Sequence, residues 1–493
     1  MYRHGFVPFT GRCLLDVNRE CFNACLLDRM NTLHQISGGC SCMIVAMSIT
    51  LNPAQRSVIE ELKTDHYPSK LLALPTNFGK TLTILTMLEE NTEELLPAII
   101  IAPKRVSERS WVEDFGKLGS SLNLHLFDAR KTARAKMRVP EATDILITSF
   151  HNFQCATSRI EAGYFKTLVI DEVDLMKSST SVRWKTAKRM RRHFQRCYGM
   201  TGTAIPSDLT TLWAMMYLID EGETFGTRKG VYLNQYFRPG YRLPSGVVAS
   251  YEELDGARDE ILARMRGGAV ICSTDVSQLV EYETEYIDLP MSERQDRLFR
   301  LAMTESIQEL RKPNDSEEDI VKKLLESTSA KASIMRQLSS GLQMDEGDVS
   351  SVEWVNPAKI DYLEMVLSGE PALIFFQYVA EREEILARLG SDAELVTTPG
   401  AIERWNNRTT KYLVAHPASV SHGVNLQFGG SRVIWVSLPP TYSIFHQGCM
   451  RVARRGQTGK VTVSALRFKN VLEYKRSGAY QKQKASIKQF LGD

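Results

Sequence analysis

The chain has 493 residues, of which 43% are apolar and 24% are charged, a composition typical of a globular protein with two or three domains. Its 61 basic and 58 acidic side chains leave a formal net charge of only +3, so any face that binds nucleic acid must be local. Apolar runs are too short for a membrane span, so a membrane partner is not expected, and the first residues lack the apolar core of a secretion signal.

Cysteines are concentrated at the start of the chain. Five of the nine, namely Cys13, Cys21, Cys25, Cys40 and Cys42, fall within residues 1–46. Thiolates at short spacing can hold zinc, but no C-x-x-C pair occurs there, so a Cys-containing extension or an over-long translation start is the simpler interpretation. The other cysteines are scattered, as expected of reduced thiols in a cytoplasmic protein.

Two sets of short apolar runs alternate with helical patterns. The first set is "KLLALP", "PAIIIAP", "DILITSF", "TLVIDE" and "RCYGMTGT", and the second is "PALIFFQ", "AELVTT", "KYLVAH", "SRVIWVS" and "KVTVSALRF". Runs that are apolar on both faces and separated by helices are typical of strands in a buried parallel sheet. The pattern therefore predicts an α/β fold with two doubly wound lobes.

The domain boundaries follow from these two sets. We expect a first lobe at residues 47–205, a mostly helical insertion and linker at 206–355, a second lobe at 356–470 and a basic C-terminal helix at 471–493. The C-terminal helix could brace the lobes, touch DNA or fray. A second basic segment, residues 185–196, could meet phosphates but is more typical of the solvated face of a helix.

The segment "LPTNFGKT" joins a predicted strand to a predicted helix. A turn that opens a helix can direct backbone N–H groups at phosphate, and Gly79, Lys80 and Thr81 supply the backbone, the charge and the hydroxyl for such a site. Asn77 stands where a glycine is common, and asparagine tolerates a left-handed backbone better than most residues. By itself this segment is weak evidence for an ATP site.

Paired acids end another predicted strand, in "TLVIDEVD". Asp171 and Thr81 could hold Mg²⁺, while Glu172 could polarise the water that attacks ATP. A single acid at a strand end is common in any fold, but two acids followed by Asp174 favour a catalytic pair.

A strand-end turn follows the acids in the chain. In "YGMTGTAIP", the short hydroxyl side chains of Thr201 and Thr203 flank Gly202, and they could sense the bonding state of the acids. Alone, such a turn carries no functional information.

Basic residues repeat at helical spacing in "HQGCMRVARRGQTGKV". Gln447, Arg451 and Arg454 would share one helix face, and the two arginines could reach a phosphate site. For an isolated helix, a solvated basic face is the simpler interpretation.

Taken in order, these motifs resemble the ATPase motor of superfamily-two helicases, specifically the Swi/Snf-like branch. The match to Q-x-x-x-R-x-x-R-x-G-Q from Gln447 to Gln457 fills every specified position, and "MTGTAIPSDLTTLW" is similar to that branch's third motif. The resemblance covers residues 50 to 470 and implies two RecA-like lobes. The sequence departs from the family at Asn77, Asp174 and His422.

The resemblance also implies roles for further residues. It places the adenine contact at Gln55, and further nucleotide contacts at Thr76, Asn77, Gly79, Lys80, Thr81, Gly423 and Gln447. It places contacts with the nucleic-acid backbone at Lys104, Thr148, Ser149, Gln377 and Ser421.

The function that the resemblance implies is a DNA-dependent ATPase that uses ATP and Mg²⁺ to translocate on double-stranded DNA. Neither a sequence-reading module nor a chromatin-reading module is evident, which fits sequence-independent backbone contacts and a compact form from a bacterial or viral source. Three alternatives remain open: a strand-separating DNA or RNA helicase, a non-catalytic nucleic-acid-binding protein, and a motor subunit with an unknown protein partner.

Overall fold

The computed structural model describes residues 51–66, 68–75, 78–104, 106–127, 138–158, 163–240, 250–271, 282–304, 333–344, 352–367, 369–420 and 424–491, with a few single positions between 241 and 249. The Cys-containing extension and its possible zinc site lie outside these residues. Within the described part, no helix is long and apolar enough to cross a membrane.

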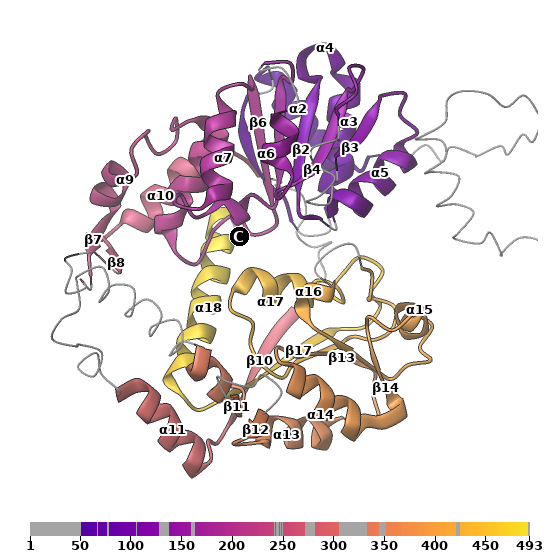
Figure 1. Cartoon of the computed structure of the whole chain (residues 1–493), viewed down its shortest axis with the longest axis vertical. Coiled ribbons are helices and arrows are strands. Elements are labelled where there is room, and N and C mark those ends of the chain that lie inside the picture. The colour runs from indigo at the N-terminus through magenta and orange to yellow at the C-terminus, as the bar shows by residue number, and fades with distance from the viewer. Residues whose placement is uncertain are drawn as a thin grey trace, which may run out of the picture. The chain divides into compact units, whose positions relative to one another are not determined.

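The first lobe is built on a parallel sheet in which seven strands are described, in the order β3-β4-β2-β5-β6-β1-β9 (Figure 1). Their bounds are β1 (Lys70–Ala73), β2 (Ala98–Ala102), β3 (Leu124–Phe127), β4 (Ile145–Ser149), β5 (Thr167–Asp171), β6 (Arg196–Thr201) and β9 (Ala269–Ile271). Strands β2, β4 and β5 are buried along their whole length, so both of their faces carry apolar side chains.

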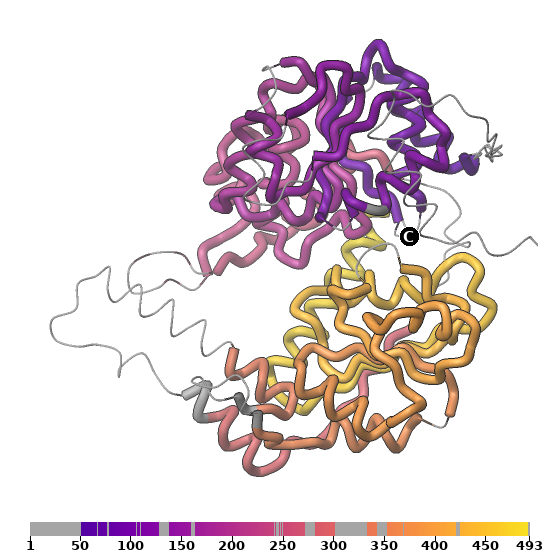
Figure 2. Tube along the Cα trace, turned by 45° about the vertical axis from the view of Figure 1, so that its right-hand side comes forward, coloured from indigo at the N-terminus to yellow at the C-terminus, as the bar shows by residue number. Residues whose placement is uncertain are grey.

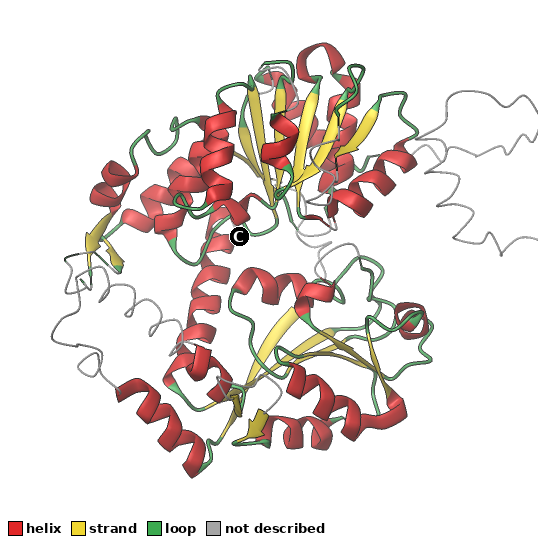
Figure 3. Cartoon of the chain, viewed as in Figure 1, coloured by secondary structure: helices red, strands yellow, loops and turns green. Residues whose placement is uncertain are grey.

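Helices cover both faces of this sheet (Figure 3). One face packs against α2 (Pro53–Thr64), α3 (Lys80–Glu90) and α5 (Trp111–Leu118), and α4 (Thr92–Leu95) follows α3. The other face packs against α6 (Phe153–Thr157), α7 (Val182–Arg191), α8 (Leu212–Asp220) and α10 (Ala257–Gly267). Successive residues of one strand enter opposite cores, Leu71 with the second group and Leu72 with the first.

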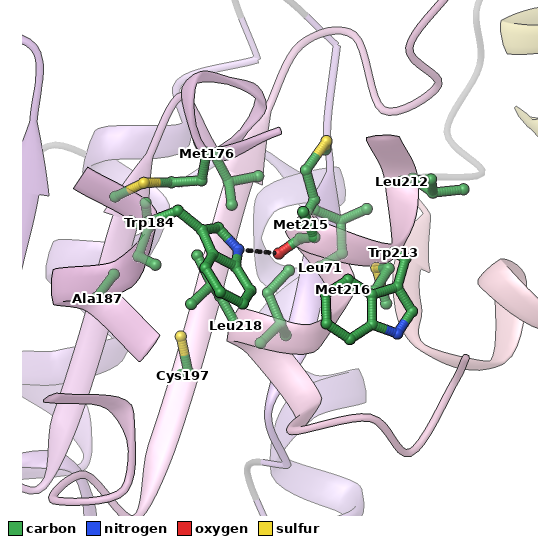
Figure 4. Close-up of a cluster of buried hydrophobic side chains, with 14 of the residues drawn as sticks. Leu71, Met176, Trp184, Ala187, Cys197, Leu212, Trp213, Met215, Met216 and Leu218 are labelled. Atoms are coloured by element: carbon green, nitrogen blue, oxygen red, sulfur yellow. Dashed lines mark hydrogen bonds between the residues drawn. The ribbon is translucent and has the colours of Figure 1, made fainter. Parts of the chain in front are cut away.

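Two tryptophans, Trp184 and Trp213, pack into the core beside α7 and α8. Trp184 is buried and its indole N–H donates to the carbonyl of Ala214 at 2.7 Å (Figure 4). Its ring lies 5.9 Å from that of Trp213. This bond satisfies the only polar atom of the Trp184 side chain, which is how a large aromatic residue is accommodated in an apolar core.

Residues 206–355 differ from the expected helical insertion. The part from α8 through α9 (Lys229–Tyr236), β7 (Phe237–Pro239), β8 (Tyr251–Glu253), α10 and β9 packs onto the first lobe, and β9 pairs with β1 in its sheet. The described remainder comprises β10 (Tyr282–Leu289), α11 (Glu293–Thr304), β11 (Leu342–Met344) and β12 (Val352–Trp354). Because β10 pairs along its whole length with β17, it belongs to the second lobe (Figure 2).

The second lobe is also a parallel sheet, with six described strands in the order β10-β17-β16-β13-β15-β14. The other strands are β13 (Ala372–Phe375), β14 (Ala393–Leu395), β15 (Tyr412–Ala415), β16 (Arg432–Trp435) and β17 (Val461–Phe468). Helices α13 (Ala358–Val366) and α14 (Val379–Leu389) cover one face, and α15 (Ala401–Asn406), α16 (Pro417–Val420) and α17 (Tyr442–Cys449) cover the other (Figure 1). The predicted fold class, two doubly wound α/β lobes, is confirmed.

The C-terminal helix α18 (Val471–Leu491) packs into both lobes. Near its start, the buried carboxylate of Glu473 pairs with the buried ammonium of Lys359 at 2.9 Å, and Tyr480 lies in the core of the second lobe. Near its end, Phe490 is fully buried in the core of the first lobe, and Gln483 donates to the carbonyl of Ile205 at 2.7 Å. Of the roles considered for this segment, these contacts fit a brace.

Two of the charges in the basic segment 185–196 have structural contacts, while Lys185, Lys188, Arg189 and Arg192 are exposed. The guanidinium of Arg191 is buried and donates to the carbonyls of Leu218, Ile219 and Phe194, and Arg196 pairs with Glu94 at 3.2 Å. These contacts leave fewer of the segment's charges free for phosphates than the sequence suggests.

Candidate functional site

The loop between β1 and α3 holds the first group of candidate residues. Gly79 has φ +86° and precedes the first residue of α3, Lys80, so the chain enters the helix through a left-handed residue. A Cβ at Gly79 would lie 2.4 Å from Nε2 of Gln55, closer than any side chain can come. Glycine is therefore favoured at this position by its left-handed backbone, and any larger residue would also displace the amide of Gln55. Thr76 and Asn77 lie outside the described residues.

The side chain of Gln55 is bonded to the same loop. Its Nε2 donates to the carbonyl of Phe78 at 2.9 Å, and its Oε1 accepts from the backbone N–H of Asn52 at 2.8 Å. The buried amide thus connects the start of α2 to the end of the loop. To contact adenine as expected, Gln55 would have to do so while it keeps its bonds to Phe78 and Asn52.

Lys80 lies within reach of the loop carbonyls and the acids. Its ammonium donates two long bonds, 3.3 Å each, to the carbonyls of Leu74 and Pro75. Burial lowers the pKa of Lys80, and the charges of Glu172 and Asp171 act in the opposite direction. Long bonds to neutral acceptors leave this charge able to meet a phosphate. The neighbouring Thr81 is half-buried on the first turn of α3.

Three acids follow one another at the carboxyl end of β5. Burial, followed by the charge of Glu172, raises the pKa of Asp171 to about 7, whereas the indole N–H of Trp111 lowers it. Burial, followed by the charge of Asp174, raises the pKa of Glu172 to about 7. Burial also raises the pKa of Asp174. Asp171 is buried, and Glu172 and Asp174 are half-buried. Raised pKa values of this kind are common for groups with catalytic roles.

Glu172 has an unusual backbone. Its φ is +54°, in the left-handed region that residues other than glycine seldom adopt. It stands between the end of β5 and a short 3₁₀ turn, Val173–Met176, so the left-handed residue turns the chain sharply at the site. Strained residues of this kind persist where the surrounding structure holds them, often at functional sites.

The second lobe supplies a polar group to this carboxylate. Gln447 of α17 donates from Nε2 to Oε1 of Glu172 at 3.5 Å. Arg451 is 7% exposed; burial and the charge of Arg454 lower its pKa to about 10, while the charge of Glu172 raises it. The structure therefore brings residues predicted from two distant motifs to one acid.

The helix carrying these residues is shorter than the spacing predicted. The helix α17 ends at Cys449, so Arg451 and Arg454 lie in the turns that follow it. Backbone bonds there run to residues two to four positions back, as from Arg451 to Gly448, so the regular helical pattern is lost. Nη1 of Arg454 is buried and has no hydrogen-bond partner in the described part of the chain. An anion bound at this point would supply one.

A second contact joins the lobes at the turn after β6. Thr203 donates from its hydroxyl to that of Ser443 on α17 at 3.2 Å, and its backbone N–H donates to the hydroxyl of Thr201 at 3.0 Å. Gly202 lies between them and is half-buried. Of the residues predicted to sense the acids, Thr203 thus contacts the helix that carries Gln447.

The residues expected to contact a nucleic-acid backbone differ in their exposure and in their hydrogen bonds. Lys104 is exposed and pairs with Glu108 at 3.3 Å, whereas Thr148 is fully buried and donates to the carbonyl of Phe127. Ser149 and Gln377 each have a buried side-chain polar atom with no hydrogen-bond partner among the described residues. Ser421 and Gly423 lie outside the described part of the chain.

Two contacting residues are missing from the set chosen by sequence. Trp111 donates from its indole to Oδ2 of Asp171 at 3.0 Å, and Ser443 meets Thr203. Trp111 lies in "RSWVEDF", within a segment that the family resemblance covers, but an apolar aromatic residue at a helix start gave no signal for a role at the site.

Comparisons with known proteins agree with the motifs. The model of the SNF2-related domain matches residues 55–340, more than half of the chain. The p41 protein of Acyrthosiphon pisum secondary endosymbiont phage 1 is 24% identical over 419 residues, which cover 80% of this chain and 88% of that protein.

Other relatives match over a shorter region. An uncharacterized ATP-dependent helicase of Mycoplasma genitalium is 29% identical over 29% of this chain and 14% of its own length. The chromatin-remodeling ATPase INO80 of Candida glabrata is 26% identical over 30% of this chain and 11% of its own length.

A solved structure also aligns with the chain. The Sulfolobus solfataricus SWI2/SNF2 ATPase core in complex with double-stranded DNA is 18% identical, with a TM-score of 0.42, over 89% of this chain and 94% of that one. Through the match at residues 55–340, the chain is a member of the SNF2-related domain family.

Proposed function

We propose that this protein is a DNA-dependent ATPase that moves along double-stranded DNA without needing to separate the strands. Membership of the SNF2-related domain family supports this proposal, as do relatives named as an ATP-dependent helicase and a chromatin-remodeling ATPase. The observation that carries it is the contact of Glu172 from the first lobe with Gln447 from the second, close enough to Arg451 for the charge of Glu172 to act on that guanidinium.

The described residues fit ATP and Mg²⁺. The left-handed Gly79 opens α3 beneath the loop, and Lys80 supplies a charge whose bonds to the protein are long. No cluster of three or more His, Cys, Asp or Glu side chains able to hold a metal occurs in the described part of the chain. Such a cluster is not needed, because Mg²⁺ usually takes one or two protein ligands together with phosphate oxygens and water. Asp171 and Thr81 are those ligands in our proposal.

Each side chain then has a distinct task in hydrolysis. Glu172 accepts a proton from the attacking water, which requires its carboxylate form. Lys80, Arg451 and Arg454 offset the negative charge that builds up on the transferred phosphoryl group. Bound Mg²⁺ would neutralise further charge on the phosphate oxygens.

The contacts between lobes suggest how hydrolysis is coupled to movement. Because Gln447 contacts Glu172 from the second lobe and Arg451 follows on the same segment, the site is complete only when the lobes meet. The contact of Thr203 with Ser443 links the same pair of elements. Closing on ATP and opening after hydrolysis would then shift Lys104, Ser149, Gln377 and Ser421 along a DNA backbone.

The test is a parallel measurement of phosphate release without nucleic acid, and with single-stranded DNA, double-stranded DNA or RNA. We expect stimulation by double-stranded DNA, abolished in Lys80→Ala and in Glu172→Gln. Lys117→Ala is the matched control, since it removes an exposed lysine that pairs with the nearby Asp114 on the same helix of that lobe.

Other results would contradict the proposal. Stimulation by RNA alone would exclude DNA as the substrate, and an absence of phosphate release under all four conditions would favour a non-catalytic binding protein. Displacement of a paired strand by the same preparation would show a strand-separating helicase.

A further inference from the structure

Trp111 is placed to act on the acid that we assign to magnesium. It is the first residue of α5, it is fully buried, and its Nε1 lies 3.0 Å from Oδ2 of Asp171. The two residues are 60 positions apart, so the bond depends on packing between α5 and the sheet.

Other buried tryptophans in the described part of the chain bond differently. The indoles of Trp184, Trp213 and Trp405 donate to the backbone carbonyls of Ala214, Gly226 and Leu426, and the indole of Trp435 donates to the thiol of Cys449 at 3.4 Å. A carbonyl is sufficient to satisfy a buried indole N–H. The bond from Trp111 to a carboxylate, where the other indoles donate to carbonyls or to a thiol, is therefore not explained by the need to satisfy its own donor.

The local backbone directs this side chain. A single turn of π-helix, Val106–Ser110, immediately precedes α5. Such turns are rare and often occur at functional sites, because the extra residue changes which side chains face inward. Trp111 follows this turn directly and enters the core shared by Leu72, Val169 and Met200.

Hydrogen bonds fix the orientation of the Asp171 carboxylate. Two donors, the indole of Trp111 and the backbone N–H of Glu172, bind the carboxylate. An ionised carboxylate has about four lone-pair positions, so about two remain for a metal ion or its water. An indole held by packing has little freedom to rotate, and it therefore fixes the direction in which those positions point.

We propose that Trp111 is a positioning residue that orients Asp171 for Mg²⁺ bound with the nucleotide. This inference rests on the proposed function, because it takes Asp171 as the magnesium ligand. Partners that orient a metal ligand from outside typically change metal affinity by about 10-fold to 100-fold when removed.

The experiment compares Trp111→Phe with Trp184→Phe in the full chain. Both variants keep a buried aromatic ring and lose an indole N–H bond in the same lobe (Figure 4 shows the bond of Trp184). Binding of a fluorescent, non-hydrolysable ATP analogue is titrated with Mg²⁺ and with EDTA. The readout is the ratio of the two affinities, which does not require turnover.

We expect Trp111→Phe to reduce the increase in affinity caused by Mg²⁺ by about 10-fold or more, with binding in EDTA unchanged. Trp184→Phe should alter neither value. In an Asp171→Asn background, Trp111→Phe should have no additional effect, since the oriented group is gone.

Three outcomes would overturn this inference or its basis. If Trp111→Phe weakens binding equally with Mg²⁺ and EDTA, Trp111 only supports the fold. If the two phenylalanine variants behave alike, the bond to Asp171 has no special role. If the unaltered protein binds the analogue no better with Mg²⁺, the proposed function itself fails, and that result is distinguishable from the other two.

Discussion

Replacing Gly79 by alanine should weaken nucleotide binding through two separable effects. At φ +86° an alanine meets the strain of the left-handed region, which costs about 1–2 kcal/mol. Its Cβ would also lie 2.4 Å from Nε2 of Gln55, so that amide must move away and lose its bond to the carbonyl of Phe78. A lost bond of this kind costs about 1 kcal/mol.

Together these effects disfavour the observed loop by about 2–3 kcal/mol, which corresponds to a roughly 30-fold to 150-fold loss of affinity. The assay is titration of a fluorescent ATP analogue into Gly79→Ala, Gln55→Ala and the double variant. Because Gln55→Ala removes the clash but not the strain, the two changes should be coupled by about 1 kcal/mol. The control is Gly119→Ala, which adds a side chain at φ +67° with no atom within 4 Å.

Either of two results would contradict the expected effect of Gly79→Ala. Binding by Gly79→Ala that equals the unaltered protein would show that nucleotide is held in another loop conformation. Strictly additive losses in the double variant would show that Gln55 and Gly79 do not share the predicted contact.

Three further predictions concern the acids, the arginine and the brace. Burial and the charge of Asp174 raise the pKa of Glu172 to about 7, so the ATPase rate should fall as the pH drops through 7 and Glu172 is protonated. Asp174→Asn removes the neighbouring charge and should move that fall to lower pH; an unchanged or upward-shifted pH–rate profile would contradict this. Arg451→Ala should lower kcat by about 10³-fold or more with a smaller change in nucleotide affinity, as steady-state kinetics and titration can measure. A comparable loss in both would indicate a binding role instead. Glu473→Ala leaves the ammonium of Lys359 buried without its carboxylate, which should lower the free energy of unfolding of the second lobe by about 3–5 kcal/mol in urea titrations. A loss below 1 kcal/mol would show that water reaches this pair.

The central strands could be predicted because both of their faces are buried. Runs such as "AIIIA" and "RVIW" are apolar at nearly every position, and they form β2 and β16. The strand β10 has a different pattern, because it lies at the edge of its sheet and is exposed at alternate positions along "YETEYIDL". Sequence alone gives such a strand a weak signal and does not say which lobe it joins.

The helices between the lobes show a second limit. Their apolar periodicity was predicted, but periodicity does not identify the surface that a helix covers. Residues 206–271 pack against the first sheet because β9 pairs with β1, and a three-residue strand carries almost no pattern of its own. The packing of the first lobe therefore extends past residue 205, where a boundary is expected from the sequence.

The site shows which relations are local and which are not. The position of Lys80 after β1 and of Asp171 at the end of β5 follows from strand patterns, because parallel strands bring their carboxyl ends together. The bond from Trp111 to Asp171 depends on how α5 packs, and the early end of α17 depends on turn bonds near Gly448. Neither the bond nor the early helix end can be predicted from the spacing of residues in the sequence.

The placement of Phe490 has a consequence for how the chain is made. The first lobe packs Met265 and Phe490 into one core, although about 220 residues separate them. At a synthesis rate of about 5–20 residues per second, Phe490 is made roughly 10–45 seconds after Met265. Until then, the core lacks this aromatic side chain. During this interval the nascent first lobe exposes an apolar surface on α10 that α18 later covers, and this surface is where a ribosome-associated chaperone would be expected to bind.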